Sequence, residues 1–152
     1  MDYFSSTSIL SELYYIGQLI LALALGGMLG WQRERWGKWA GPRTYALVTA
    51  GATLFTVLSL NAFGSSPAMV AAGIVTGIGF LGAGTILHKE NRVEGLTTAA
   101  GLWISAAIGM AVGIGYYLLA IGVSIMVLLI FMFNDLPFRK CETGIKTKGK
   151  KL

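Results

Sequence analysis

The sequence predicts an all-α membrane protein, a bundle of five transmembrane helices with the N-terminus outside and the C-terminus inside. Apolar residues make up 55% of the 152 residues and charged residues only 12%, about half of the usual ~25%. Three long stretches, residues 13–32, 44–88 and 95–134, contain no Asp, Glu, Lys or Arg. The Lys and Arg residues are confined to alternate connections and to the C-terminal end, as expected for a chain that crosses a membrane repeatedly.

The charge-free stretches give the helices in order. A transmembrane helix needs about 20 predominantly apolar residues, so the first stretch holds one helix. Each of the other two holds two, because turn-forming residues interrupt them at 61–67 and 113–117. The expected helices are residues 13–32, 44–62, 68–87, 97–113 and 117–134. Residues 1–135 are thus expected to form the transmembrane domain, and residues 136–152 a short, basic, disordered cytoplasmic tail.

The distribution of basic residues predicts the orientation. All 12 Lys and Arg residues lie after the first helix, after the third helix or in the tail. Cytoplasmic connections are enriched in Lys and Arg, so these three segments are expected inside. The N-terminal segment has no basic residue ahead of the first helix, so that helix is expected to be an uncleaved anchor in the lipid bilayer.

Several function classes are disfavoured by composition. The single Cys excludes a disulfide within the chain, and the single His removes most catalytic triads and transition-metal sites. Residues 77–82 fit G-x-G-x-x-G, but they lie inside an apolar stretch rather than between a strand and a helix, so no dinucleotide cofactor is expected. The tail is too short to form a platform for nucleic acid. The last four helices lack ionisable residues at mid-depth, which argues against an ion-coupled transporter and against an enzyme.

Rows of small residues predict close packing between helices, because lipid supplies no hydrophobic drive for helix association. One row is Gly26 and Gly30 in the first helix. Another recurs every four residues in the fourth helix as Gly101, Ser105, Gly109 and Gly113. The same role is expected for residues of the third helix, with exposed carbonyls lining a passage as the alternative; these residues are Gly73, Gly77, Gly79, Gly82 and Gly84. Trp103 is expected to pack against its neighbours.

Polar residues at the cytoplasmic side are the candidate functional network. Arg33 and Glu34 end the first helix, and Arg43 starts the second. One interpretation is that these charges only reach toward the headgroups beside Trp anchors. The other is a buried network in which Glu34 pairs with Arg43 or Arg33 and fixes the loop. Thr97 and Thr98 are expected to cap the fourth helix or to bond across helices.

Three carboxylates on the same side are candidate magnesium ligands. They are Glu34 in the first cytoplasmic loop and Glu90 and Glu94 in the second. Magnesium prefers oxygen ligands and keeps several waters, so three carboxylates could hold it loosely. Each carboxylate also has a Lys or Arg nearby, and ion pairing is the alternative. His88 is expected to be an interfacial histidine.

Three sequence blocks resemble the transmembrane domain of the MgtC/SapB family of bacterial membrane proteins. The first contains L-G, R-E and A-G-P-R-T-Y-A-L-V within residues 29–48. The second is V-A-A-G-I-V-T-G-I-G-F-L-G-A-G-T-I at residues 70–86, and the third is V-E-G-L-T-T-A-A-G-L-W at residues 93–103. The resemblance covers roughly residues 20–115. It implies a multi-pass protein with five spans in the bacterial cytoplasmic (inner) membrane.

The resemblance also implies a function. Family members are associated with growth under magnesium limitation and, in some pathogens, with survival in the host. We therefore expect a non-enzymatic protein that aids adaptation to low magnesium by acting on other membrane complexes, such as the F-type ATP synthase. A homo-oligomer is one expected state. The alternative is a small Mg²⁺ or solute channel or transporter.

The sequence departs from the family pattern at a few positions. Gln32 replaces the first Glu of an expected E-R pair, and Ser66, Met69 and Gly73 replace outer polar residues. The soluble C-terminal domain of longer members is not present in these 152 residues. The resemblance therefore implies the fold more directly than the function.

Overall fold

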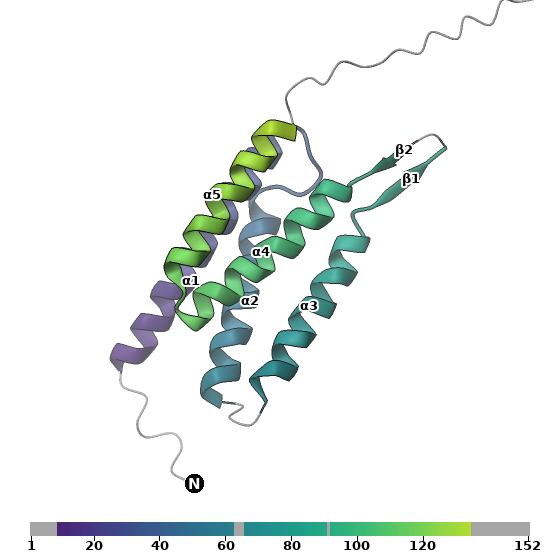
Figure 1. Ribbon diagram of the computed structural model, residues 1–152. Coiled ribbons are helices and arrows are strands. Elements are labelled where there is room, and N and C mark those ends of the chain that lie inside the picture. The colour runs from purple at the N-terminus through teal and green to yellow at the C-terminus, as the bar shows by residue number, and fades with distance from the viewer. Residues whose placement is uncertain (1–8, 63–65, 91, 135–152) are drawn as a thin grey trace, which may run out of the picture.

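The computed structural model describes residues 9–62, 66–90 and 92–134, which form five helices and one short β-hairpin (Figure 1). The elements are α1 (Ile9–Arg35), α2 (Pro42–Ala62), α3 (Pro67–Ala83), β1 (Leu87–Lys89), β2 (Arg92–Glu94), α4 (Leu96–Ile114) and α5 (Tyr117–Asn134). The described residues thus contain all five helices that the sequence predicts. The predicted tail, residues 136–152, lies outside them.

The helices are apolar on their exposed faces. By length and composition, α1, α2 and α4 can each cross a membrane, and α3 and α5 are shorter apolar helices. Large apolar side chains such as Phe80 and Leu118 are more than four-fifths exposed. Exposed apolar surface on this scale is unusual for a soluble monomer and is typical of a protein surrounded by lipid.

Helix α4 lies at the centre of the bundle. It contacts each of the other four helices, and α2 packs between α1 and α4. Leu102, Ile108 and Val112 of α4 are among the most deeply buried side chains. Helices α2 and α4 begin, and α3 ends, at the same end of the bundle. We call it the hairpin end because β1 and β2 project from it (Figure 1).

Glycines set the spacing between α1, α2 and α4, as their rows predict. A Cβ on Gly26 would lie 2.6 Å from the carbonyl oxygen of Tyr45 in α2, and a Cβ on Gly30 would lie 2.5 Å from Pro42 Cα. On α4, a Cβ on Gly113 would lie 2.8 Å from Thr56 Cβ. Any larger residue at these positions would push the helices apart, so the prediction for both rows is confirmed.

The predicted packing role of the α3 glycines is corrected, because most of them contact no other helix of the same chain. A Cβ on Gly73, Gly77 or Gly79 would meet no atom within 4 Å. Gly82 does face another helix, since its Cβ would lie 3.6 Å from Ala99, whereas a Cβ on Gly84 would meet only carbonyls of its own helix end. The reason is that α3 lies at the side of the bundle and packs mainly beside α4 and α2.

Trp103 on α4 also differs from its expected packing role. Its side chain is 49% exposed, although α4 is the central helix. It therefore projects from the bundle rather than filling its core. The exposed half of the ring is open to lipid or to another protein, and the other half lies against its own chain.

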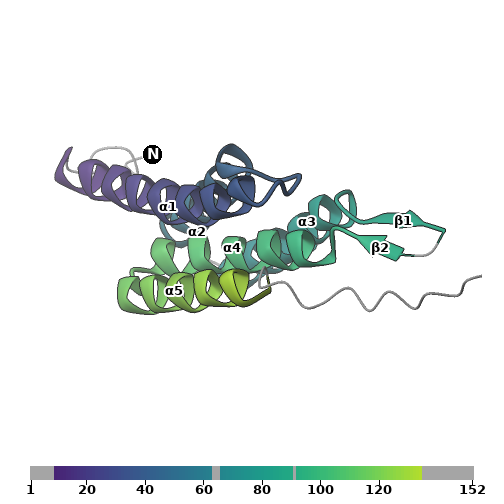
Figure 2. The same ribbon diagram turned by 90° about the horizontal axis from the view of Figure 1, so that it is seen from above.

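The hairpin is a further correction, because residues 84–87 were expected to belong to the third helix. Helix α3 ends at Ala83, where the N–H groups of Thr85 and Ile86 turn back to carbonyls three residues earlier. The chain then forms an antiparallel pair in which Lys89 faces Arg92 and Leu87 faces Glu94. Figure 2 shows this hairpin continuing past the end of α3. Strand signals of three residues are too short to recognise by alternation.

Candidate functional site at the hairpin end

A buried arginine dominates the hairpin end. Arg33 lies in the last turn of α1, which ends because Gly37 takes a left-handed conformation and its N–H bonds back to Glu34. The side chain of Arg33 is 1% exposed, and its guanidinium carbon lies 4.3 Å from the centre of the Phe131 ring of α5. A buried charge is costly unless it is compensated, and an aromatic face supplies part of that compensation.

Tyr45 joins the arginine to α2 and α4. Its side chain is fully buried, its ring meets Phe131 edge-to-face at 6.5 Å, and Arg33 lies within hydrogen-bonding reach of its hydroxyl. The hydroxyl donates to the carbonyl of Thr98, 3.5 Å away. Gly101 makes room for both rings, since a Cβ there would overlap the Tyr45 hydroxyl and lie 2.8 Å from Phe131 Cζ.

These residues form one cluster drawn from α1, α2, α4 and α5. We call it the Arg33 cluster; its members are Arg33, Tyr45, Thr98, Gly101 and Phe131. The cluster positions helices rather than reacting with a substrate, because the planar, permanently charged guanidinium of Arg33 lies between the ring face of Phe131 and the hydroxyl of Tyr45. The cluster therefore fixes the end of α1 against α5 and the start of α4.

The sequence-predicted network is only partly brought together. Arg33 and Thr98 are buried in the cluster, and Thr97 is half-buried beside it. Glu34 and Arg43 are exposed, and the described residues show no ion pair between them. The predicted pairing of Glu34 is therefore corrected to an aromatic environment for Arg33. Tyr45 and Phe131 were missed, because an aromatic residue in an apolar helix gives no signal of a cationic partner.

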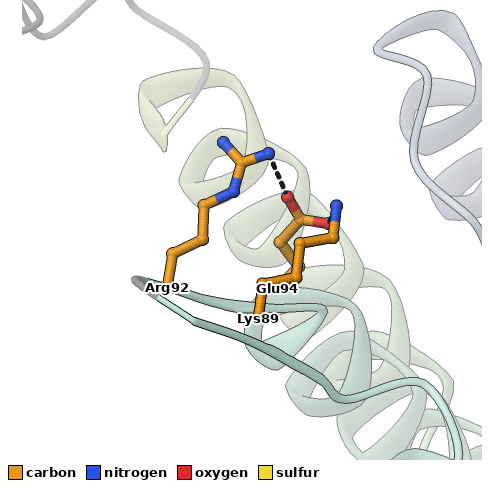
Figure 3. A network of polar contacts seen from close by, with 3 residues as sticks. All are labelled: Lys89, Arg92 and Glu94. Carbon is orange, nitrogen blue, oxygen red and sulfur yellow. Dashed lines mark ion pairs between the residues drawn. The ribbon is translucent and has the colours of Figure 1, made fainter.

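The hairpin carboxylate is paired with two basic residues (Figure 3). Glu94 lies 2.9 Å from Lys89 Nζ and 2.7 Å from an Arg92 guanidinium nitrogen, all on the same face of the hairpin. The hydrogen bond from Lys89, reinforced by the charge of Arg92, holds the pKa of Glu94 below its ordinary value of 4.5. Ion pairing, the alternative to a metal role, is thus the state of Glu94.

The three candidate magnesium ligands do not form one site in the described part of the chain. No group of three His, Cys, Asp or Glu side chains gathers there closely enough to hold a metal ion. Glu34 belongs to the end of α1, whereas Glu90 lies in the turn of the hairpin and is exposed. A metal site built from Glu34, Glu90 and Glu94 together is therefore not supported by the geometry. His88 is exposed on the opposite hairpin face, beside Val93.

A second polar cluster ties the opposite end of the bundle. Gln18 of α1 is buried, and its amide nitrogen donates to the carbonyl of Val112 at 2.9 Å and to the hydroxyl of Tyr117 at 3.0 Å. The Tyr117 hydroxyl is also hydrogen-bonded to that of Tyr14. Between the two ends, Thr53 of α2 donates to the carbonyl of Gly109 in α4 at 2.8 Å. These bonds hold α1, α2, α4 and α5 together.

Comparison with known proteins identifies the family. The model of the MgtC family matches residues 19–136, which include the Arg33 cluster and the hairpin. This chain belongs to the MgtC family. The resemblance inferred from the three sequence blocks is thereby confirmed, and the fold described above is that of an MgtC family transmembrane region.

Relatives within the family share much of the sequence. The chain is 45% identical over 138 residues to the protein MgtC of Salmonella typhimurium, which covers 90% of this chain and 60% of that protein. It is 45% identical over 135 residues to a protein of Escherichia coli K12 named "Putative magnesium transporter YhiD", covering 82% and 63%. An uncharacterized protein of Haemophilus influenzae is 36% identical over 139 residues. The chain thus spans about three-fifths of these relatives. No solved structure matches it.

Proposed function

We propose that this chain is a non-enzymatic, multi-pass protein of the bacterial cytoplasmic membrane that aids adaptation to low magnesium by acting on other membrane complexes. The observation that carries the proposal is its 45% identity to the protein MgtC and to a protein named for magnesium transport. We further propose five spans, with the N-terminus outside and the hairpin end inside. All basic residues of the described helices and loops lie at that end, which supports this orientation.

The geometry favours regulation over conduction. Buried hydroxyls inside the bundle bond to backbone carbonyls, as those of Thr49 and Ser105 do within their own helices and that of Thr53 does to Gly109. Glycines bring α1, α2 and α4 into backbone contact. A partner complex in the membrane, with the F-type ATP synthase as the candidate that family resemblance implies, would bind the exposed apolar faces. A homo-oligomer would use the same faces.

A magnesium or solute channel or transporter is the second candidate function. The observation that favours it is the name of the YhiD relative, "Putative magnesium transporter YhiD". In that case the functional path would run between copies of the chain or along the open face of α3, where a Cβ on Gly73, Gly77 or Gly79 would meet no atom within 4 Å.

A measurement of Mg²⁺ flux into liposomes separates the two candidate functions. The purified full chain is placed in liposomes that contain a Mg²⁺-sensitive dye, and Mg²⁺ entry is compared with that into empty liposomes. A regulator gives no entry above the empty liposomes, whereas saturable entry would overturn the proposal in favour of the channel.

A growth assay tests the magnesium role independently. Deleting the gene is expected to slow growth at low external magnesium, and the wild-type chain restores it. Arg33→Gln is expected to fail to restore growth, because the buried cluster loses its charge. Arg92→Gln removes an exposed charge and serves as the matched control that restores growth. Normal growth of the deletion strain at low magnesium would contradict the role.

A further inference from the structure

An apolar groove runs between α2 and α3 on the outside of the bundle. Its volume is about 580 Å³, within the ~300–1,000 Å³ of typical small-molecule sites. Ala106 of α4 contributes to its floor, and the other lining residues come from α2 and α3. Every lining residue is Gly, Ala, Val, Leu, Ile or Phe. The groove therefore suits a hydrocarbon and offers nothing to coordinate an ion.

Two glycines create the space. Gly73 and Gly77 both line the groove, and a Cβ on either would meet no atom within 4 Å. Gly79, on the same helix, also faces open space but does not line the groove. The missing side chains at 73 and 77 thus deepen the groove rather than admit a neighbouring helix of the same chain.

The groove has the length of one leaflet. Along α3 its lining runs from Val70 to Leu81, which at 1.5 Å per residue is about 16 Å. That is about half of the ~30 Å hydrocarbon core of a bilayer. One acyl chain of a lipid in a single leaflet covers the same depth.

A positive charge marks the end of the groove nearest the hairpin. Leu47 of α2 lines the groove, and Arg43 lies four residues earlier on the same helix face. Arg43 is exposed and forms no ion pair with any described residue. Arg43 is the second residue of α2, and helical side chains tilt toward the helix N-terminus, so its charge is expected at the level of the headgroups of that leaflet. Arginine binds phosphate strongly.

We propose that the groove binds an anionic phospholipid, with one acyl chain between α2 and α3 and the phosphate on Arg43. The apolar lining, the leaflet-length span and the charge at one end together fit this occupant. A helix from a second copy would fill the apolar part but would leave the charge of Arg43 unused. The proposal requires the chain to sit in a bilayer and is independent of whether it regulates or conducts.

Lipid retention by the purified full chain tests the proposal. Native mass spectrometry compares retained phosphatidylglycerol with phosphatidylcholine of the same acyl chains. The wild-type chain is expected to prefer phosphatidylglycerol by about fivefold, the contribution of one arginine near an anionic headgroup. Arg43→Gln should abolish the preference, whereas Arg92→Gln, at an exposed hairpin cation, should keep it.

Filling the groove tests the acyl-chain part. Gly77→Leu is expected to reduce retention of both lipids, and Gly79→Leu is the matched control on the same helix. A lipid with a photoreactive acyl chain should form adducts with groove residues such as Leu47 and Ile74 in the wild-type chain. Equal retention by Gly77→Leu and Gly79→Leu, adducts spread evenly over the helices, or a copy-to-copy crosslink through the introduced thiol of Gly77→Cys would overturn the proposal.

Discussion

Replacing Gly101 by Ala tests whether the Arg33 cluster depends on the closeness of α4. The added Cβ would overlap the Tyr45 hydroxyl and lie 2.8 Å from Phe131 Cζ. Both rings are buried, with Phe131 3% exposed and Tyr45 0%, so neither can move into solvent. The substitution therefore forces either the rings or α4 itself to shift.

The magnitude follows from three contributions. Overpacking of a well-packed core costs about 1–3 kcal/mol. Displacing the Tyr45 hydroxyl from Thr98 costs about 0.5–1.5 kcal/mol more. Alanine recovers up to about 1 kcal/mol of helix propensity over glycine. The net loss expected for Gly101→Ala is about 0.5–3.5 kcal/mol.

The assay is the unfolding free energy of the purified chain in detergent. Gly51→Ala in α2 is the control, because a Cβ there would meet no atom within 4 Å. We expect Gly51→Ala to equal or exceed the wild-type stability and Gly101→Ala to fall below it. Equal stability of the two variants would refute the reasoning, since it would mean that the rings are free to move.

Two further predictions concern the same end of the bundle. Phe131→Leu should lower the unfolding free energy by about 1–3 kcal/mol, because it removes the aromatic face beneath Arg33. Phe133→Leu, on the exposed side of α5, is the control and should change the unfolding free energy little. Similar losses for both variants would argue against the cation–π contact. Because the folded pKa of Glu94 lies below 4.5, its stabilisation of the hairpin is present above that pH and is lost as the pH falls through the folded pKa. Amide exchange in the hairpin should thus be relatively faster at low pH after correction for intrinsic rates, and Glu94→Gln should remove the difference.

The sequence predicts the helices well because their signals are long. Charge-free stretches and turn formers give five helices, and the break at residues 113–117 corresponds to Gly115, whose φ is +93°. The close-packing rows at Gly26 and Gly109 were recognisable because small residues recur every four positions. The hairpin was missed because three-residue strands have no detectable period.

The site was harder to predict because it depends on which helix faces meet. The sequence places Arg33 beside Glu34, and pairing between neighbouring opposite charges is the simplest expectation. In the fold, the helix turn directs Arg33 inward and Glu34 outward, so Arg33 meets Phe131, almost 100 residues away. Gly77 was misjudged for the same reason, because the sequence does not show which face of α3 meets another helix. Its small size indicated packing, but its face of α3 borders open space.

Helices α1 and α3 differ so much in length that a bilayer of one thickness cannot match both. At 1.5 Å per residue, the 27 residues of α1 extend about 40 Å, whereas the 17 residues of α3 extend about 25 Å. If both helices span the bilayer, as proposed, α1 either tilts or extends its charged end beyond a hydrocarbon thickness of about 30 Å, whereas lipid beside the shorter α3 would have to thin. The protein would therefore deform the bilayer unevenly around its circumference. Bilayers built from shorter acyl chains would fit the α3 side better and bear less of this hydrophobic mismatch.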